Sequence, residues 1–158
     1  MVNTITSRAV AEVVAAAGGR LAVSAVGHTR MKAVMAEGLK ARYARHRAYG
    51  KAVRAALATY GLKPLAEAGI EAPTLTTFRH VEGTDDAAFR AALAKRGMIV
   101  AGALASLAGK AFRLGHMGST TPEMLEKAIT LIGEVLNELG MKADSGKAVA
   151  EFRKVYLA

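Results

Sequence analysis

Apolar residues recur along this chain with two spacings, one typical of strands and one typical of helices. Short β-prone runs predict strands over residues 2–5, 21–26, 62–65, 74–81, 98–100 and 110–114. Apolar positions three or four residues apart predict helices over residues 8–17 and 29–60, and three more that begin near residues 85, 122 and 145. This order predicts an α/β (α+β) fold, a two-layer sandwich of a mixed sheet with helices packed on it, in which an N-terminal βαβ segment runs through a long helix into the rest of the chain.

Residues that favour helix ends support these boundaries. The expected N-caps are Ser7, Thr84, Thr121 and Ser145. The helix over 29–60 is long for a globular protein, and it contains Gly38 and Gly50, each of which costs about 1 kcal/mol relative to alanine in a helix interior. We therefore expect two units that are joined through one continuous helix.

Composition excludes several classes of protein. Hydrophobic residues make up 52% of the 158 positions, which is enough for a compact core. No run approaches 18 consecutive apolar residues and the start lacks a basic region followed by an apolar one, so we expect no membrane span, no secretory signal and a cytoplasmic location. The chain has no cysteine, and no HxxxH or HExxH spacing occurs among its four histidines, so we expect neither disulfides nor a metal site.

The formal net charge of +9 raises the question of an anionic partner. Residues 30–54 hold eight Lys or Arg and one acid, Glu37. On a helical wheel one arc collects basic residues, while apolar residues line another face; the basic arc is formed by Lys32, Lys40, Arg47, Lys51 and Arg54. We interpret the arc as a solvated helix face that binds polyanions weakly, with no specific nucleic-acid partner.

The segment KAFRLGHMG, residues 110–118, carries the best candidate for chemistry. Arg113 alternates with Phe112 and Leu114 on a predicted strand, and a lone guanidinium there suits bidentate binding of a carboxylate. Together with GALASLAGK, the helix GTDDAAFRAALAKRG and the helix TPEMLEKAITLIGEVLNELG, the segment resembles the C-terminal small domain of class V aminotransferases, the alanine–glyoxylate and serine–pyruvate group of PLP-dependent enzymes. The resemblance covers residues 37–158 and implies that Arg113 binds the substrate's α-carboxylate.

Residues 1–36 do not continue that family. The TSRAV start, the GGR turn and VGHTRMKAVM resemble a segment of the α-D-phosphohexomutases, the phosphomannomutase and phosphoglucomutase superfamily. The resemblance implies that His28 and Lys32 lie near a phosphosugar, and their i, i+4 spacing on a helix would place both on one face. Ser24-Ala25 departs from the family, which carries a basic residue there, and the sugar-binding and phosphoserine loops are absent.

Neither catalytic apparatus is complete. None of the ten lysines has the serine-rich context of a Schiff-base lysine, and no serine stands beside a DxDxD metal loop. We therefore expect no enzyme activity and no bound cofactor. The simplest interpretation is an engineered or recombined chimera, a phosphohexomutase-like segment (1–36) joined within the long helix to an aminotransferase-like small domain (37–158) in one compact unit, whose property is folding.

Two alternatives remain open. The chain is a truncated class V aminotransferase-like domain that forms the carboxylate-binding part of a PLP enzyme, or it is a phosphate- or polyanion-binding protein that uses His28, Lys32 and the basic helix. A small domain without its large domain also leaves apolar surface uncovered. We expect the N-terminal segment or a second copy of the chain to cover that surface.

Overall fold

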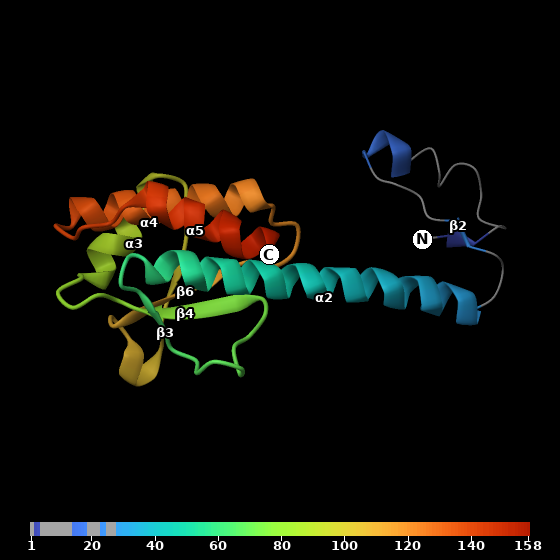
Figure 1. The fold of residues 1–158 in the computed structure, drawn as a ribbon, viewed down its shortest axis with the longest axis horizontal. Helices are drawn as coiled ribbons and strands as arrows, with labels where there is room; N and C mark the ends of the chain where they lie inside the picture. The colour runs from blue at the N-terminus through green and yellow to red at the C-terminus, as the bar shows by residue number, and fades with distance from the viewer. Residues whose placement is uncertain (1, 4–13, 19–22, 25–27) are drawn as a thin grey trace. The chain divides into compact units, whose positions relative to one another are not determined.

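The computed structural model describes residues 2–3, 14–18, 23–24 and 28–158, and its side chains for residues 14–18 and 38–158 (Figure 1). The predicted cap Ser7 and most of the predicted helix over 8–17 lie outside the described residues. The chain divides into two compact units, Met1–Ala44 and Arg45–Ala158. The predicted boundary between residues 36 and 37 concerns ancestry, and it stays a prediction.

In the first unit, two short strands pair with each other. β1 (Val2–Asn3) lies parallel to β2 (Val23–Ser24), with Val2 opposite Val23, and residues 14–16 between them are helical. A parallel pair with a helical connection is the predicted βαβ arrangement. The two strands form a sheet of their own, separate from the sheet of the second unit.

The predicted long helix is confirmed as α2 (His28–Ala58), which belongs in part to each unit. Both Gly38 and Gly50 lie inside it. The chain leaves α2 through Gly61, whose φ of +80° is a backbone conformation that glycine adopts without a steric penalty. Three side chains of the predicted apolar face, Tyr49, Val53 and Tyr60, are buried in the second unit.

Four strands of the second unit form one antiparallel sheet in the order β3-β4-β6-β5. They are β3 (Lys63–Pro64), β4 (Leu75–Arg79), β5 (Ala101–Gly102) and β6 (Ala111–Gly115). The predicted α/β fold with helices packed on a sheet is confirmed. The sheet of this unit is antiparallel and not mixed, because the parallel pair lies in the other unit. The strand predicted over 98–100 is also displaced, since the paired residues are Ala101 and Gly102.

Three further helices complete the second unit. α3 (Asp86–Lys95), α4 (Pro122–Glu138) and α5 (Ser145–Leu157) follow the strands, and a short 3₁₀ turn, η1 (Ala105–Leu107), connects β5 to β6. Thr121 caps α4 as predicted, through the Met124 N–H. The N-caps of α3 and α5 are Asp85 and Asp144, each one residue from the predicted position. Their carboxylates accept hydrogen bonds from free N–H groups of the first helical turn.

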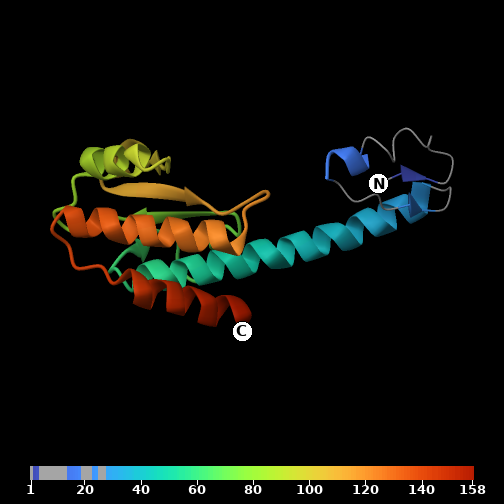
Figure 2. The same ribbon diagram turned by 90° about the horizontal axis from the view of Figure 1, so that it is seen from above.

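The helices cover one face of the sheet. Figure 1 shows α3, α4 and α5 on one side of the strands, and Figure 2 shows α4 and α5 lying side by side. Phe78 and Phe112, which are paired across β4 and β6, are fully buried against these helices. Alternate residues of the same strands, including Thr77 and Arg113, point to the opposite face and are only partly buried. That second face carries the candidate site.

Candidate functional site

Arg113 lies at the middle of β6, on the face of the sheet that the helices leave open. It is paired with Thr77 of β4 on one side and with Ala101 of β5 on the other. Its neighbours Phe112 and Leu114 point into the core, so strand alternation directs the guanidinium away from the core. The sequence-based placement of Arg113 on a strand, between two buried residues, is confirmed.

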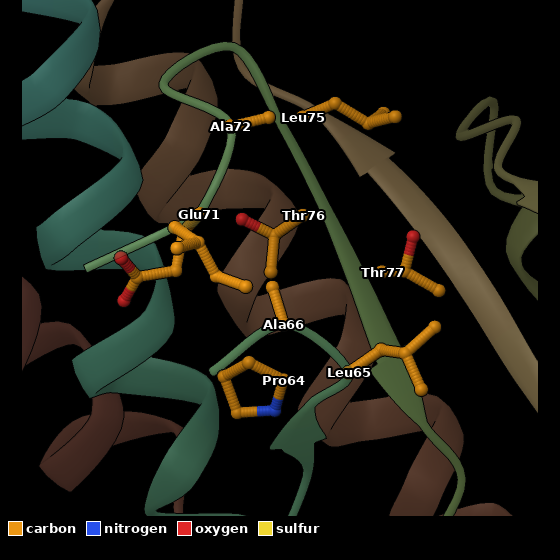
Figure 3. A pocket seen from close by; sticks show the side chains of 9 residues that line it. Pro64, Leu65, Ala66, Glu71, Ala72, Leu75, Thr76 and Thr77 are labelled. Atoms are coloured by element: carbon orange, nitrogen blue, oxygen red, sulfur yellow. The ribbon is translucent and has the colours of Figure 1, made fainter. Parts of the chain in front are cut away.

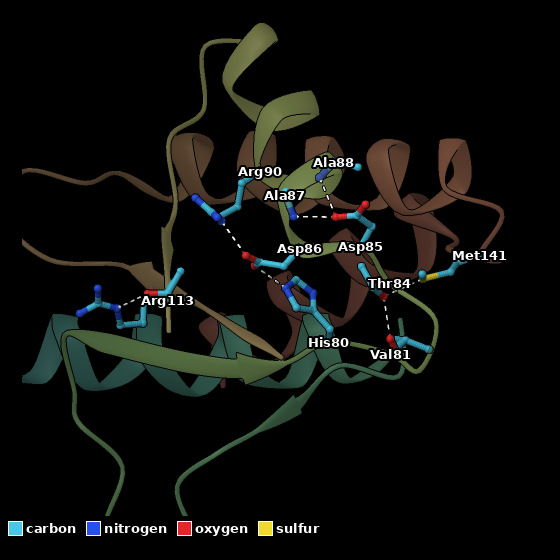
Figure 4. Close-up of polar contacts among 11 residues, drawn as sticks. His80, Val81, Thr84, Asp85, Asp86, Ala87, Ala88, Arg90, Arg113 and Met141 are labelled. Carbon is cyan, nitrogen blue, oxygen red and sulfur yellow. Dashed lines mark hydrogen bonds and ion pairs between the residues drawn. The ribbon is translucent and has the colours of Figure 1, made fainter. Parts of the chain in front are cut away.

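The guanidinium of Arg113 is held at one nitrogen. Its Nε donates a 3.0 Å hydrogen bond to the carbonyl oxygen of Gly102 (Figure 4). Among the residues that the structure describes, this is the one hydrogen bond that the Arg113 side chain makes. The terminal Nη1 and Nη2 therefore keep their hydrogens for a ligand, and this edge of the guanidinium has the fork geometry that matches a carboxylate.

A second polar network lies close to Gly102, at the start of α3. The Asp86 carboxylate accepts hydrogen bonds from His80 Nε2 at 2.8 Å and from Arg90 Nε at 2.9 Å (Figure 4). Burial alone would raise the pKa of Asp86, but these two hydrogen bonds outweigh burial and lower the pKa below its ordinary value. Asp86 is therefore ionised at neutral pH and fixes the direction of the Arg90 side chain.

Two arginines lie against Gly102, each at a different atom. A Cβ atom at Gly102 would lie 3.4 Å from Arg90 Nε and 3.5 Å from Arg90 Cζ, while the carbonyl of the same residue binds Arg113. One guanidinium therefore packs against the α-carbon and the other bonds to the oxygen. Sequence analysis did not single out Arg90 or Gly102. The sequence feature that could have indicated Arg90 is its i, i+4 spacing from Asp86 on a predicted helix.

A shallow hollow of about 290 Å³ borders β4, the strand beside Arg113 (Figure 3). Leu75 and Thr77 of β4 form one wall, and Thr77 is the cross-strand partner of Arg113. The remaining lining comes mostly from the end of β3 and the segment between β3 and β4, namely Pro64, Leu65, Ala66, Ile70, Glu71 and Ala72. The hollow is mainly apolar, and Arg113, whose guanidinium is bonded to Gly102 on the β5 side, does not line it.

On the core side of the sheet, His116 forms a buried polar group. Its Nε2 shares a 3.0 Å hydrogen bond with Thr76 Oγ1, to which Arg54 Nη1 also donates at 3.5 Å. Burial lowers the pKa of His116 to about 4, and the positive charge of Arg54 adds to this effect. His116 is therefore neutral at physiological pH, and its contacts give it a structural role.

The other two predicted site residues, His28 and Lys32, lie in α2 within the first unit. Their side chains lie outside the described residues. The structure thus describes the surroundings of Arg113 but does not test the phosphate-binding interpretation of His28 and Lys32.

The described lysines do not fit attachment of PLP. A Schiff-base lysine needs an enclosed environment that lowers its pKa. Every lysine whose side chain is described is exposed, and these are Lys40, Lys51, Lys63, Lys95, Lys110, Lys127, Lys142, Lys147 and Lys154. We therefore derive no chemical step through PLP from this part of the chain.

The described ranges contain no group of three or more His, Asp or Glu side chains that could hold a metal ion. Over the same ranges, no helix has the length and apolar character needed to cross a membrane.

Comparison with known proteins points to aminotransferases, although no family model matches the chain. An uncharacterized aminotransferase of Methanocaldococcus jannaschii is 36% identical over 120 residues, which is 75% of this chain and 31% of the relative. The pyridoxamine–pyruvate transaminase of Mesorhizobium japonicum is 37% identical over 116 residues, 72% of this chain and 30% of the relative. The chain thus spans about a third of the length of the curated relatives it matches.

Solved structures give the same result. The pyridoxamine–pyruvate aminotransferase of Mesorhizobium loti superposes with a TM-score of 0.71 at 34% identity, over 77% of this chain and 32% of that one. The ureidoglycine–glyoxylate aminotransferase of Bacillus subtilis gives a TM-score of 0.72 at 29% identity, over 80% of this chain and 33% of that one. The resemblance to aminotransferases that the sequence analysis inferred is confirmed.

These relatives correct the main functional interpretation. A recombined chimera whose property is folding is wrong, because the homologues over most of the chain are aminotransferases. The findings favour the alternative, a truncated aminotransferase-like domain. Nothing in the comparisons supports the phosphohexomutase likeness of residues 1–36.

Proposed function

We propose that this chain is part of a class V aminotransferase and supplies the domain that binds the carboxylate of the substrate. The observation that carries the proposal is Arg113, a guanidinium on the open face of the sheet with Nε bonded to Gly102 and its fork edge available. The aminotransferase relatives support the proposal, since they match most of the chain at 34–37% identity.

Arg113 acts in this proposal by binding and orienting. The bond from Nε to the Gly102 carbonyl restricts rotation of the guanidinium, so less side-chain entropy is lost when a carboxylate binds. The ligand is an amino acid or a 2-oxo acid, because these are the carboxylates that a transaminase exchanges. The Schiff-base lysine comes from outside this chain, and the chain by itself does not catalyse transamination.

A titration followed by NMR tests this role. The ¹⁵N-labelled chain is titrated with L-alanine and with acetate while the Nε–Hε signal of Arg113 is observed. We expect a saturable shift of that signal with a dissociation constant on the order of 1–10 mM, as befits one half-buried arginine. Arg113→Gln is expected to remove saturable binding without changing the rest of the spectrum.

Arg79→Gln is the matched control. Arg79 lies on β4, on the same face of the sheet as Arg113, and it is exposed. This variant keeps the fold and removes one positive charge, so binding should persist if the site is specific. Equal loss of binding in both variants, or an Arg113 signal that does not respond to carboxylate, would refute the proposal.

A further inference from the structure

The loop between β6 and α4, residues 116–121, is held against α2 by two consecutive side chains. Arg45 Nη2 donates a 2.8 Å hydrogen bond to the carbonyl oxygen of Gly118, and the N–H of the same glycine donates a 3.1 Å hydrogen bond to His46 Nε2. Gly118 has a φ of +73°, so the loop turns sharply at this residue. Side chains that lie 73 and 72 positions earlier in the chain thus bind both backbone groups of one turn residue.

One of these two bonds requires a neutral histidine. Nε2 accepts a hydrogen bond and therefore carries no proton, so the ring of His46 is neutral with its hydrogen on Nδ1. The residue is buried, at 6% exposure. A proton added at Nε2 would face the Gly118 N–H, and the imidazolium, which has only donors, could no longer accept this bond. The bond from Arg45 to the Gly118 oxygen would be left to hold the loop alone.

The surroundings of His46 provide no bonded acid to replace Gly118 as a partner. The charged and titratable groups around His46 and Tyr49, its neighbour one turn along the helix, come from four parts of the chain, and they are Arg42, Arg45, Tyr49 and Arg54 of α2, His116 after β6, Glu123 of α4 and Tyr156 of α5. Glu123 is the one acid in this set. Within the described residues it makes no hydrogen bond or ion pair with His46.

We propose that Arg45 and His46 form a pH-sensitive latch on the loop between β6 and α4, which is closed while His46 is neutral and opens when solvent protonates Nε2. Histidine is the side chain whose ordinary change of charge falls between pH 5 and 8, so mild acid is the signal. The loop continues β6, the strand that carries Arg113. The latch therefore acts at the end of the strand proposed to bind a carboxylate, but it does not depend on that function.

Amide hydrogen exchange at Gly118, measured by NMR in the intact chain, tests the latch. The protection factor compares the observed rate with the rate of a free amide at the same pH, and this removes the chemical effect of pH itself. We expect the protection factor of Gly118 to fall about tenfold between about pH 8 and about pH 5.5. The reference is Gly140, whose N–H is bonded to the Asn137 carbonyl and should keep its protection. A constant value at Gly118, or an equal fall at Gly140, would overturn the proposal.

Two variants identify the titrating group. His46→Gln supplies an acceptor that does not titrate, so Gly118 should stay protected at both pH values, whereas His46→Leu should leave it unprotected at both. His116→Gln is the matched control, because burial holds the pKa of His116 at about 4 and its loss should not remove the fall. A fall that persists in His46→Gln, or that disappears in His116→Gln, would refute the latch. The comparison within the unmodified chain does not depend on the folding of any variant.

Discussion

Single residues in the second unit carry measurable consequences, and His116 is the most buried polar one. It lies at 0% exposure, bonded to Thr76 and near Arg54. The folded chain therefore contains a neutral imidazole at a place where a protonated one would be strongly disfavoured.

The pH dependence of stability follows from this lowered pKa. His116 titrates at about 4 when folded and at about 6.5 when unfolded, so the unfolded chain binds the extra proton between these values. The free energy of unfolding is therefore unaffected by this group above pH 6.5, and it falls by about 3 kcal/mol in total as the pH is lowered from 6.5 towards 4. Urea unfolding between pH 7 and pH 4 measures it. His116→Gln should flatten this part of the profile, and an unchanged slope would show that another group is responsible.

Ala105 is a residue in a strained conformation. Its φ of +51° places an L side chain in the left-handed region, at the start of η1. Ala105→Gly should therefore raise the free energy of unfolding by about 0.5–1 kcal/mol, the relief of strain exceeding the extra entropy of glycine in the unfolded chain. Ala108→Gly is the control, since Ala108 has a φ of −54° and should lose stability. Thermal unfolding of both variants measures whether each substitution raises or lowers stability.

At this scale the sequence predicted Arg113 but not its partners. A strand arginine between two buried residues is visible in the order Phe112, Arg113, Leu114. The contact of Arg113 with Gly102 arises from the pairing of β5 with β6, and that of Arg90 with Gly102 arises from the packing of α3 on β5. Such long-range pairing depends on the whole sheet, and local spacing does not contain it.

Among the elements, α2 shows how the same residue type has two different roles within one helix. A Cβ at Gly38 would meet nothing within 4 Å. A Cβ at Gly50 would lie 3.0 Å from Arg54 Nη1, 3.0 Å from His116 Cε1 and 3.4 Å from the Pro73 carbonyl. Gly50 is therefore needed for close packing, whereas Gly38 only weakens the helix.

Alanine at these two positions should act in opposite directions. Gly38→Ala should raise stability by about 0.5–1 kcal/mol, through helix propensity alone. Gly50→Ala should lower it by about 1–2 kcal/mol, because the buried His116 ring and the Arg54 guanidinium must move. Circular dichroism during thermal unfolding measures both, and a gain from Gly50→Ala would contradict the packing described here.

The order of the helices and strands was largely predictable from the sequence, whereas the pairing of the strands in the sheet was not. Amphipathic spacing and caps place the starts of α2, α3, α4 and α5 within one residue of the observed starts. The strand predicted over 98–100 was misplaced, because apolar Ile99 is 89% exposed and the pairing falls on Ala101 and Gly102. A two-residue strand contributes too few positions for its alternation to be recognised.

At the scale of the whole molecule, the phosphohexomutase resemblance rests on a short segment of sequence. The VGHTRMKAVM likeness extends over ten residues, whereas the aminotransferase likeness extends over 120. A ten-residue match with generic helix-forming residues carries little information about descent. The missing lysine motif agrees with the proposal that the chain is one part of a transaminase, and it does not by itself exclude a part in catalysis.

The whole chain should not form a defined adduct with PLP. Every lysine side chain that the structure describes is exposed, so each should react slowly and without preference. After incubation with PLP and borohydride, peptide mass spectrometry should find partial labelling spread over many lysines. A free-lysine peptide of similar composition serves as the control. Stoichiometric labelling at one lysine, with a defined absorbance band, would contradict this expectation.

The edges of the four-stranded sheet offer little backbone for pairing with a foreign strand. Both edge strands, β3 and β5, are two residues long, and β3 contains Pro64, which has no N–H to donate. On β5 the Gly102 carbonyl is occupied by Arg113. The arginine proposed to bind substrate thus also blocks the addition of a foreign strand. Arg113→Gln should consequently aggregate faster than Arg79→Gln on gentle heating, as followed by light scattering and thioflavin fluorescence.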